Sequence, residues 1–576
     1  MLPRTWLVIV ILLLCNSIYA QADSLGFAAF GDSLATADSI GYWAENDSLA
    51  ATEIKVTKAE VELWLDELEA NNSVSVLDHA ALQRDFGDIY NNGYFFIGRP
   101  NVAMPYLYGF EQLAGVFSAS LYHGYYYSLY PSVTAGANID YVETEYPFTP
   151  ALSCIQAGLG DYEHRFAKIS LWKNNLLSFK GVTYKGNLLV QNGYWTDIIS
   201  AETSQKHYLS YRGEQLTVEA EYAFWAKDVA MSELLPVYWI NNNYSISHQL
   251  KHYYLGLKSK FGAVSVIHLK ESASASQFAA DISGEATKIM LSTGMNLGIM
   301  QYNAFYEHVI SESDFDFPAA FAAESYQNKI GLAVAGAVPI DYTFKADLLD
   351  WERGRIFADL SKGVKSIRIG AYANLLAGEN AFVDSVVSIY NPAELFPHLD
   401  VDTRREAAAY LSYDWWGSTA LLAAGSKAIK QDSPIALLQA ENEQIFVKLA
   451  LAIKHKYKSW ELQANPAWTW AKANSGMVES PEFRFQSVQN LSYHLPWNNS
   501  LVAGFSVNGH SGYYAANALM PYLIEASTIL DAWGGFDIDH YFQFRAGVKN
   551  VFSSAIYSAY PVPLSTYAEL KWYYLN

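Results

Sequence analysis

Cysteine is scarce in this 576-residue chain, which has only two, Cys15 and Cys154. The first lies in an N-terminal segment that we expect to be removed on export, so one cysteine remains and no intrachain disulfide can form. Zinc sites built from paired cysteines are excluded for the same reason. We therefore expect a fold that does not depend on disulfides for its stability.

Basic charge is also in short supply. Lys and Arg number 38 against 58 Asp and Glu, which gives a formal net charge of -20. Binding to nucleic-acid phosphates needs clustered Lys and Arg, so this balance argues against a nucleic-acid partner. Charged residues of both signs make up 17% of the chain, below the roughly 25% of an ordinary soluble domain.

Long apolar runs and familiar catalytic motifs are missing as well. The longest candidate run outside the N-terminus, 330–338, is rich in Ala and Gly and falls short of the roughly 20 residues of a spanning helix. The sequence has no Gly-rich phosphate loop, no zinc-binding His-Glu-x-x-His helix and no nucleophile elbow. We therefore predict neither a helical membrane protein nor an enzyme, and expect no cofactor.

The N-terminus has the layout of a secretory signal peptide. Arg4 gives a positive start, residues 7–14 form an unbroken apolar run, and 16–20 make a polar exit. We predict cleavage after about Ala20, because such a run is too short to span a bilayer as a helix. Lipidation at Cys15 is an alternative, although the residue before it is bulky where such sites have a small one.

What the chain does have is aromatic residues and a period of two. Tyr, Phe and Trp number 42, 29 and 16, or 15% of the chain. In 216–224 apolar side chains occupy every even position, and because successive strand residues point to opposite faces they form one stripe. The stripe consists of Leu216, Val218, Ala220, Tyr222 and Phe224. The same alternation recurs in 447–454, 542–549 and 569–574.

This alternation predicts an antiparallel transmembrane β-barrel, because only the outward face of such a barrel needs to be apolar. A soluble sandwich would alternate too, and the aromatic clusters decide between them. Rings of Tyr and Trp are expected where a barrel meets lipid headgroups. Clusters stand at 125–127, 415–416, 468–470 and 572–574. We predict an all-β fold whose outer stripes contact the lipids of the cell outer membrane.

The chain divides into four segments by composition. After the signal peptide (1–20), residues 21–58 are rich in Ala, Asp and Ser and read as a flexible acidic arm. Residues 59–165 combine a helical pattern with Gly, Asn and Pro punctuation and predict a small α+β domain. Residues 166–576 carry the alternating strands, enough for about 18–22 crossings. Because so wide a barrel would be an open hole, we expect the small domain to fill its lumen as a plug.

Several short motifs, taken in order, resemble the TonB-dependent outer-membrane receptors. The segment 73–83 resembles the start of that family's plug, and 88–92 falls where the plug has a helix end. Near the C-terminus, 547–552 is similar to the family's Asn-Leu-Phe signature, and 561–563 precedes a closing aromatic strand. A β-prone hexapeptide in the arm resembles the family's TonB box: Thr52, Glu53, Ile54, Lys55, Val56 and Thr57.

The resemblance implies a receptor that takes up a scarce small solute with energy delivered through the TonB complex of the inner membrane. The hexapeptide would pair with an edge strand of TonB through backbone hydrogen bonds. The sequence also departs from the family. The Arg-Gly segment of the plug is absent, 157–162 retains little of its Gly-rich run, and the chain ends in Leu575-Asn576 rather than Phe.

Two other functions remain open at this stage. One is a passive porin-like channel whose N-terminal domain narrows the pore. The other is a soluble carbohydrate-active enzyme that uses Glu219 and Glu221 as a carboxylate pair, although lumen-facing polar residues explain these two more simply.

Two local clusters carry weaker signals. Glu312, Asp314 and Asp316 are a weak candidate for a Ca²⁺ site, and an exposed acidic loop is the simpler interpretation. His510 and Ser511 are neighbours, but adjacent strand residues face opposite sides and cannot form a catalytic dyad; a solvated loop is expected there.

Overall fold

The structure is a computed structural model, and the chain divides into two units, residues 1–57 and 58–576. It describes 118–123, 139–143, 148 and 150–575, except for 149, 162–164, 196–197, 232–243, 276–279, 297–299, 317–319, 338, 350–352, 378–399, 433–439, 474–481, 516–521, 525, 540, 550 and 553–563. The predicted signal peptide, the acidic arm with its hexapeptide 52–57 and most of 59–165 lie outside the described residues. These expectations stay predictions.

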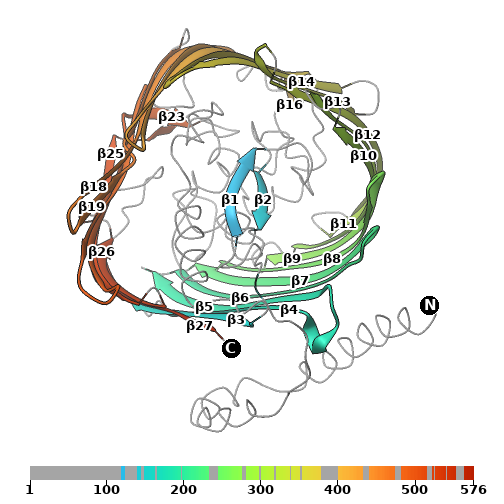
Figure 1. The fold of residues 1–576 in the computed structure, drawn as a ribbon. Coiled ribbons are helices and arrows are strands. Elements are labelled where there is room, and N and C mark those ends of the chain that lie inside the picture. Colours follow the sequence, from blue (N-terminus) through green and yellow to red (C-terminus); the bar gives the residue numbers. More distant parts are fainter. Residues whose placement is uncertain are drawn as a thin grey trace. The chain divides into compact units, whose positions relative to one another are not determined.

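One closed antiparallel barrel dominates the second unit (Figure 1). Neighbouring strands pair in chain order, and the last strand pairs with the first to close the ring. The barrel strands are β3 (Leu152–Gly160), β4 (Arg165–Asn174), β5 (Val182–Trp195), β6 (Ile198–Arg212), β7 (Leu216–Met231), β8 (Tyr244–Ser259), β9 (Gly262–Ala275), β10 (Ala280–Asn296), β11 (Met300–Asp316), β12 (Ala320–Gly336), β13 (Asp341–Leu349), β14 (Arg353–Val364), β15 (Ile367–Ala377), β16 (Asp400–Trp415), β17 (Ser418–Asp432), β18 (Ala440–Tyr457), β19 (Trp460–Ala464), β20 (Ala467–Ala473), β21 (Phe483–His494), β22 (Ser500–His510), β25 (Ser527–Ile538), β26 (Phe542–Lys549) and β27 (Ser565–Leu575).

The strand count agrees with the prediction. The ring contains 23 strand segments, but β19 and β20 both pair with β18 and β21 and are two halves of one crossing, which leaves 22. Asn465 and Pro466 separate the halves, since Pro has no backbone N–H to donate to the ladder. The interruption still satisfies the backbone, because the N–H of Asn465 donates to Val488 O and that of Leu451 donates to Pro466 O.

The start of the barrel differs from the predicted boundary at residue 166. Strand β3 begins at Leu152 and includes residues 157–160, part of the run compared with the Gly-rich plug segment. The alternation is present there, with Cys154 fully buried and Ile155 and Leu159 exposed. The alternation is hard to recognise in the sequence because two positions are glycines, which count neither as apolar nor as polar.

Two small sheets and one short helix complete the described part. Strands β1 (Ser118–His123) and β2 (Ile139–Glu143) form an antiparallel pair of their own. Strands β23 (Tyr513–Ala515) and β24 (Tyr522–Ile524) form another, within the connection between β22 and β25. The 3₁₀ turn η3 (Leu176–Ser178) joins β4 to β5. Among the described residues, no helix has the length and apolar character needed to cross a membrane.

The outer face of the wall carries a continuous apolar belt, as the stripes predict. Its clearest row crosses β8 to β13, each residue standing opposite the next on the neighbouring strand. These side chains are 36–44% exposed although they are large and apolar, so they face outward. The row consists of Leu257, Val264, Leu291, Tyr306, Ile330 and Leu348. Such a belt is what a lipid-facing surface requires.

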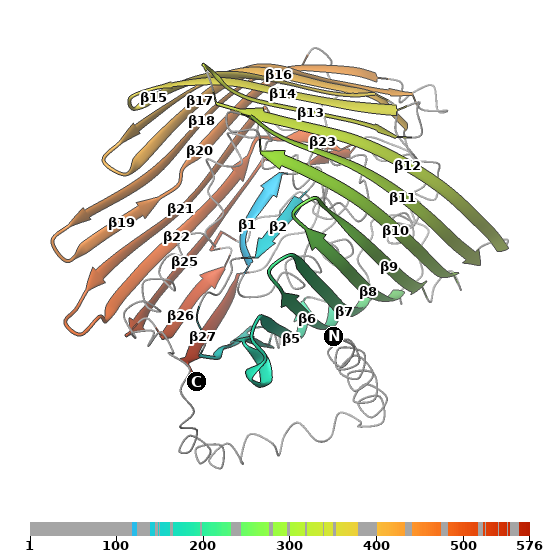
Figure 2. The ribbon, with the colours of Figure 1, turned by 45° about the vertical axis from the view of Figure 1, so that its right-hand side comes forward.

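The two rims of the barrel differ in the length of the connections between strands. Figure 2 shows the strands that run obliquely from one rim to the other. On the rim that carries the chain's last strand end, connections are short, such as 260–261, 365–366 and 416–417. On the other rim several are long, such as 232–243 and 378–399, whereas others, such as 196–197 and 350–352, are short. Short turns on one side and long loops on the other are typical of outer-membrane barrels, whose short turns face the periplasm. We call these the turn rim and the loop rim.

Aromatic side chains collect at the turn rim. Trp416 and Trp497 lie in turns and are 93% and 86% exposed, and Tyr457, Trp460 and Tyr574 lie beside the rim. Trp416 and Gly417 both have positive φ, the backbone of a two-residue hairpin turn that follows strand twist. The aromatic clusters predicted at 415–416 and 572–574 therefore form part of an interfacial girdle.

Candidate functional site: the inner wall of the barrel

The inner face of the wall is polar where the outer face is apolar. On β7 Leu216 is exposed on the outside, whereas Glu219, on the opposite face, is 9% exposed. Its carboxylate accepts hydrogen bonds from Tyr254 Oη at 3.0 Å and Lys258 Nζ at 2.9 Å, both on β8. The neighbouring inner position, Glu221, pairs with Lys206 of β6 at 3.2 Å.

These contacts bear on the two carboxylates that an enzyme would use as acid and base. Glu219 and Glu221 do share a face, as the spacing predicts, but each is bound to a lysine of a different neighbouring strand. The pairs neutralise both carboxylates and hold them against the wall. The arrangement favours the simpler interpretation that they are lumen-facing polar residues.

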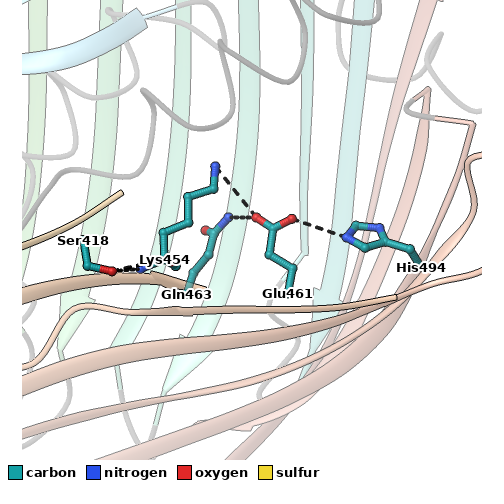
Figure 3. A network of polar contacts seen from close by, with 5 residues as sticks. All are labelled: Ser418, Lys454, Glu461, Gln463 and His494. Atoms are coloured by element: carbon teal, nitrogen blue, oxygen red, sulfur yellow. Dashed lines mark hydrogen bonds and ion pairs between the residues drawn. The ribbon is translucent and has the colours of Figure 1, made fainter. Parts of the chain in front are cut away.

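A second inner network ties four strands together near the turn rim (Figure 3). Glu461 of β19 is its centre: Oε1 accepts from Gln463 Nε2 at 2.9 Å and lies 3.8 Å from Lys454 Nζ. Glu461 Oε2 lies 3.3 Å from Nε2 of His494, on β21. Ser418 Oγ of β17 accepts from the Lys454 backbone N–H at 3.1 Å. The network gives this part of the lumen bound charges of both signs.

Aromatic and apolar side chains line other parts of the inner wall. Lys185 Nζ lies 4.0 Å from the ring centroid of Trp172 and 5.0 Å from that of Tyr208, a cation between two aromatic faces. Farther round the wall, Tyr372 and Phe446 are each 3% exposed and belong to an apolar cluster with Tyr410 packed against it. The inner wall therefore combines ionic, aromatic and apolar side chains, of which Trp172, Tyr372 and Phe446 are buried.

The remaining local predictions have mixed outcomes. Glu312, Asp314 and Asp316 lie in β11, not in a loop, because their alternation continues the strand and pairs with β10; their side chains are outside the described set. No group of three or more potential metal ligands occurs among the described residues.

His510 ends β22 and is 8% exposed, so the expected solvated loop is wrong there. The strand simply extends to this residue before the chain turns. Its Nδ1 lies 2.9 Å from the backbone O of Ser511, whose hydroxyl accepts from the Phe483 N–H. The two side chains do not form a dyad.

Sequence reasoning missed the cations that pair with the inner carboxylates. Lys206 and Lys258 come from strands on either side of β7, and the partner of each is set by strand register. The alternation places all four charges on one face, but the register depends on the turns between the strands. The alternation indicates which charged residues face the lumen, but it does not predict which carboxylate pairs with which lysine.

Comparisons with known proteins give a fold and no sequence family. No protein-family model matches the chain, and no curated protein sequence matches it. The structure is similar to the siderophore receptor PirA from Pseudomonas aeruginosa, with a TM-score of 0.57, 10% identity, and coverage of 79% of this chain and 86% of that one.

Two further receptor structures are similar to the same degree. The ferripyoverdine receptor of the outer membrane of Pseudomonas aeruginosa gives a TM-score of 0.55 at 11% identity, covering 76% of this chain and 74% of that one. BauA, the ferric preacinetobactin receptor from Acinetobacter baumannii, gives 0.53 at 12% identity, covering 76% and 82%. The chain has the fold of the TonB-dependent receptors.

Proposed function

We propose that this barrel is an outer-membrane receptor that takes up a scarce small solute with energy delivered through TonB. The observation that carries the proposal is the closed barrel of 22 crossings with the fold of siderophore receptors. A barrel of that width encloses an aqueous lumen unless something fills it. An outer membrane holds no ATP, so work to concentrate a solute has to come from the inner membrane.

Two segments that lie mostly or entirely outside the described residues complete the proposal. Residues 59 to about 150 form the plug, and TonB binds the hexapeptide 52–57, which we call the handle. The solute class to test first is a ferric siderophore, because the similar structures are receptors for such compounds. The exposed Lys454 and His494 side chains of the inner wall suit a polar, charged solute.

The decisive experiment changes the backbone of the handle. Lys55→Pro removes a backbone donor and restricts the preceding residue, so it prevents strand pairing with a partner. We expect it to abolish energised uptake of a radiolabelled ferric siderophore while binding at the cell surface stays near normal. Lys55→Ala keeps the backbone and serves as the matched control, with uptake close to wild type.

A second measurement separates the receptor from a passive channel. In liposome-swelling assays, the full-length receptor should admit small sugars slowly, because its lumen is plugged. Rapid swelling, together with normal uptake by Lys55→Pro cells, would support the porin-like alternative and rule out energy coupling.

A further inference from the structure

The hairpin of β14 and β15 carries two exposed lysines at the turn rim. Lys362 of β14 has the same parity as Leu360 and Val364, which face outward, so its side chain faces outward too. Val364 pairs with Ile367, which leaves Lys365 as the first residue of a two-residue turn, with a φ of 56°. Both lysine side chains are exposed. The hairpin thus places two cations three residues apart on the lipid side of the wall.

The outward neighbours of Lys362 carry no charge. Its row, followed in register from β15 to β20, contains only apolar side chains. The row consists of Ile369, Leu411, Leu422, Leu449 and Trp468. On the other side β13 begins opposite Ser361, and the connection before β13, residues 337–340, reads Ala-Val-Pro-Ile. Within the described strands β14 to β20, Lys362 is therefore the one charged residue of this lipid-facing row.

The carboxylates of the neighbouring strands lie on the other face of the wall. Three of them occur near the hairpin, and all three have the parity of the inner face. Each has a polar partner within 3.6 Å. The pairs are Asp341 with Arg368, Asp359 with Tyr410, and Asp414 with Thr419. The outward positive charge of the two lysines is therefore not balanced by these carboxylates.

Apolar side chains surround the lysines on the outer face and are widely exposed. Leu360 and Ile369 are 56% and 62% exposed, and Val364 and Ile367 beside the turn are 60% and 44% exposed. Acyl chains cover such a surface in a membrane. Tyr413 stands opposite Ile367 and is 48% exposed, which marks this level as the membrane interface.

The side chain of Lys362 can reach that interface. Lys362 lies two residues, or about 7 Å along the strand, from Val364 on the midplane side. A lysine in an apolar row extends its four-carbon stem along the neighbouring apolar surface and keeps its ammonium group in the polar interface. The ammonium group of Lys362 is thereby directed toward the turn that carries Lys365.

We propose that Lys362 and Lys365 bind the phosphate of an anionic phospholipid in the leaflet on the turn-rim side, with its acyl chains along Leu360 and Ile369. Each ammonium group offers up to three N–H donors to the phosphate oxygens. An anionic lipid supplies the negative charge that the outer face lacks here. The inference rests on the barrel spanning a membrane and not on the solute or on TonB, so a failure of either proposal leaves the other standing.

The test is native mass spectrometry of the full chain in neutral detergent with phosphatidylglycerol as the probe. Wild type should retain phosphatidylglycerol in preference to phosphatidylcholine, whose own cation compensates its phosphate. Lys362→Gln should weaken the binding about fivefold and Lys362→Gln/Lys365→Gln about 25-fold, because each lysine at an anionic lipid surface favours binding by about that factor. Lys362→Arg/Lys365→Arg keeps both charges and should bind like wild type.

The matched control is Lys456→Gln. Lys456 is exposed on β18 near the same rim, but it has the parity of lumen-facing Lys454 and stands opposite Glu461. Its loss should leave phosphatidylglycerol binding unchanged, and a loss as large as that of Lys362→Gln would mean that only total charge matters and would overturn the site. Equal binding by wild type and the double variant would overturn it as well. Competition by millimolar glycerol phosphate as strong as that by the lipid would overturn the lipid assignment.

Discussion

Consecutive residues of β10 point to opposite faces of the wall, and the surroundings of the two faces differ. Leu291 points outward, 44% exposed, between Val264 and Tyr306 of the adjacent strands. Ser292, the next residue, points inward between Ala263 and Phe305. Both residues share one backbone ladder, so strand propensity does not separate them. The surroundings on each side of the wall decide which side chain is stable there.

A consequence of this comparison is that the register is strongly specified. Because the side-chain period is two, a slip by one residue would move a whole apolar row into the lumen and a polar row into lipid. The belt from Leu257 to Leu348 crosses six strands without a break. Every strand in that series therefore holds its neighbours in register.

The largest effect is expected from placing a charge on the lipid side. Leu291→Arg puts a guanidinium group into the apolar belt, where a cation costs roughly 2–4 kcal/mol near the membrane midplane. The free energy of unfolding, measured by reversible urea titration in lipid vesicles, should fall by that amount. The loss is smaller the closer the residue lies to an interface.

The same substitution one residue later is the control. Ser292→Arg places the cation at the same depth on the inner face, beside Phe305 and no charged cross-strand neighbour. The free energy of unfolding should change by less than about 1 kcal/mol, as for a surface substitution. Equal losses for both variants would mean that the inner and outer assignments are wrong.

The second effect comes from a glycine that makes room for an inner contact. Gly256 lies beneath the ring of Tyr254, and a Cβ at this position would collide with the Tyr254 hydroxyl. That hydroxyl donates to Glu219. Gly256→Ala should therefore displace the ring and cost about 1–3 kcal/mol of unfolding free energy, as overpacking does.

Gly363 provides a matched control on β14. A Cβ there would meet nothing within 4 Å. Gly363→Ala should be neutral or stabilise the fold slightly, because alanine loses less backbone entropy on folding than glycine. Both variants are compared in the same urea titration, and a loss at position 363 as large as that at 256 would contradict the close-packing explanation.

The sequence allowed the outer surface to be predicted better than the inner contacts. Alternation identified which residues of 216–224, 447–454 and 542–549 face lipid, because a membrane imposes one chemistry on every outward position. The inner wall obeys no such single rule: Glu461 gains Lys454 and His494 through register between β18, β19 and β21. Turn geometry sets this register, and the side-chain pattern alone does not encode it.

The boundary of the barrel shows a second limit. Residues 157–160 are Ala-Gly-Leu-Gly, and glycine is compatible with either face of a strand and with a plug loop. Strand pairing decides between them: β3 pairs with β4 and with β27, and β27 lies at the other end of the barrel sequence. A contact so distant in the chain cannot be read from local periodicity.

A third, smaller effect concerns the inner network of Figure 3. Glu461→Ala removes the acceptor shared by Gln463, Lys454 and His494. The cost should be about 1 kcal/mol, because the Lys454 and His494 side chains are 58% and 40% exposed and water replaces part of the interaction. Glu461→Gln keeps an acceptor and should lose less in the same titration; an equal loss would assign the effect to packing.

The smallest effect compares ion pairs on the two faces directly. The inner pair Lys206–Glu221 has side chains 15% and 16% exposed, whereas those of the outer pair Lys270–Glu285 are 55% and 48% exposed. Attraction between charges weakens as water and salt surround them, so burial favours the inner pair. A double-mutant cycle with Lys206→Met and Glu221→Gln should give a coupling free energy of about 1 kcal/mol. The corresponding cycle with Lys270→Met and Glu285→Gln should give a smaller coupling that falls further at high salt. A larger coupling free energy for the outer pair would mean that its surroundings exclude water, as burial in lipid or a bound partner would do. The membrane boundary on β9 and β10 would then lie closer to the loop rim.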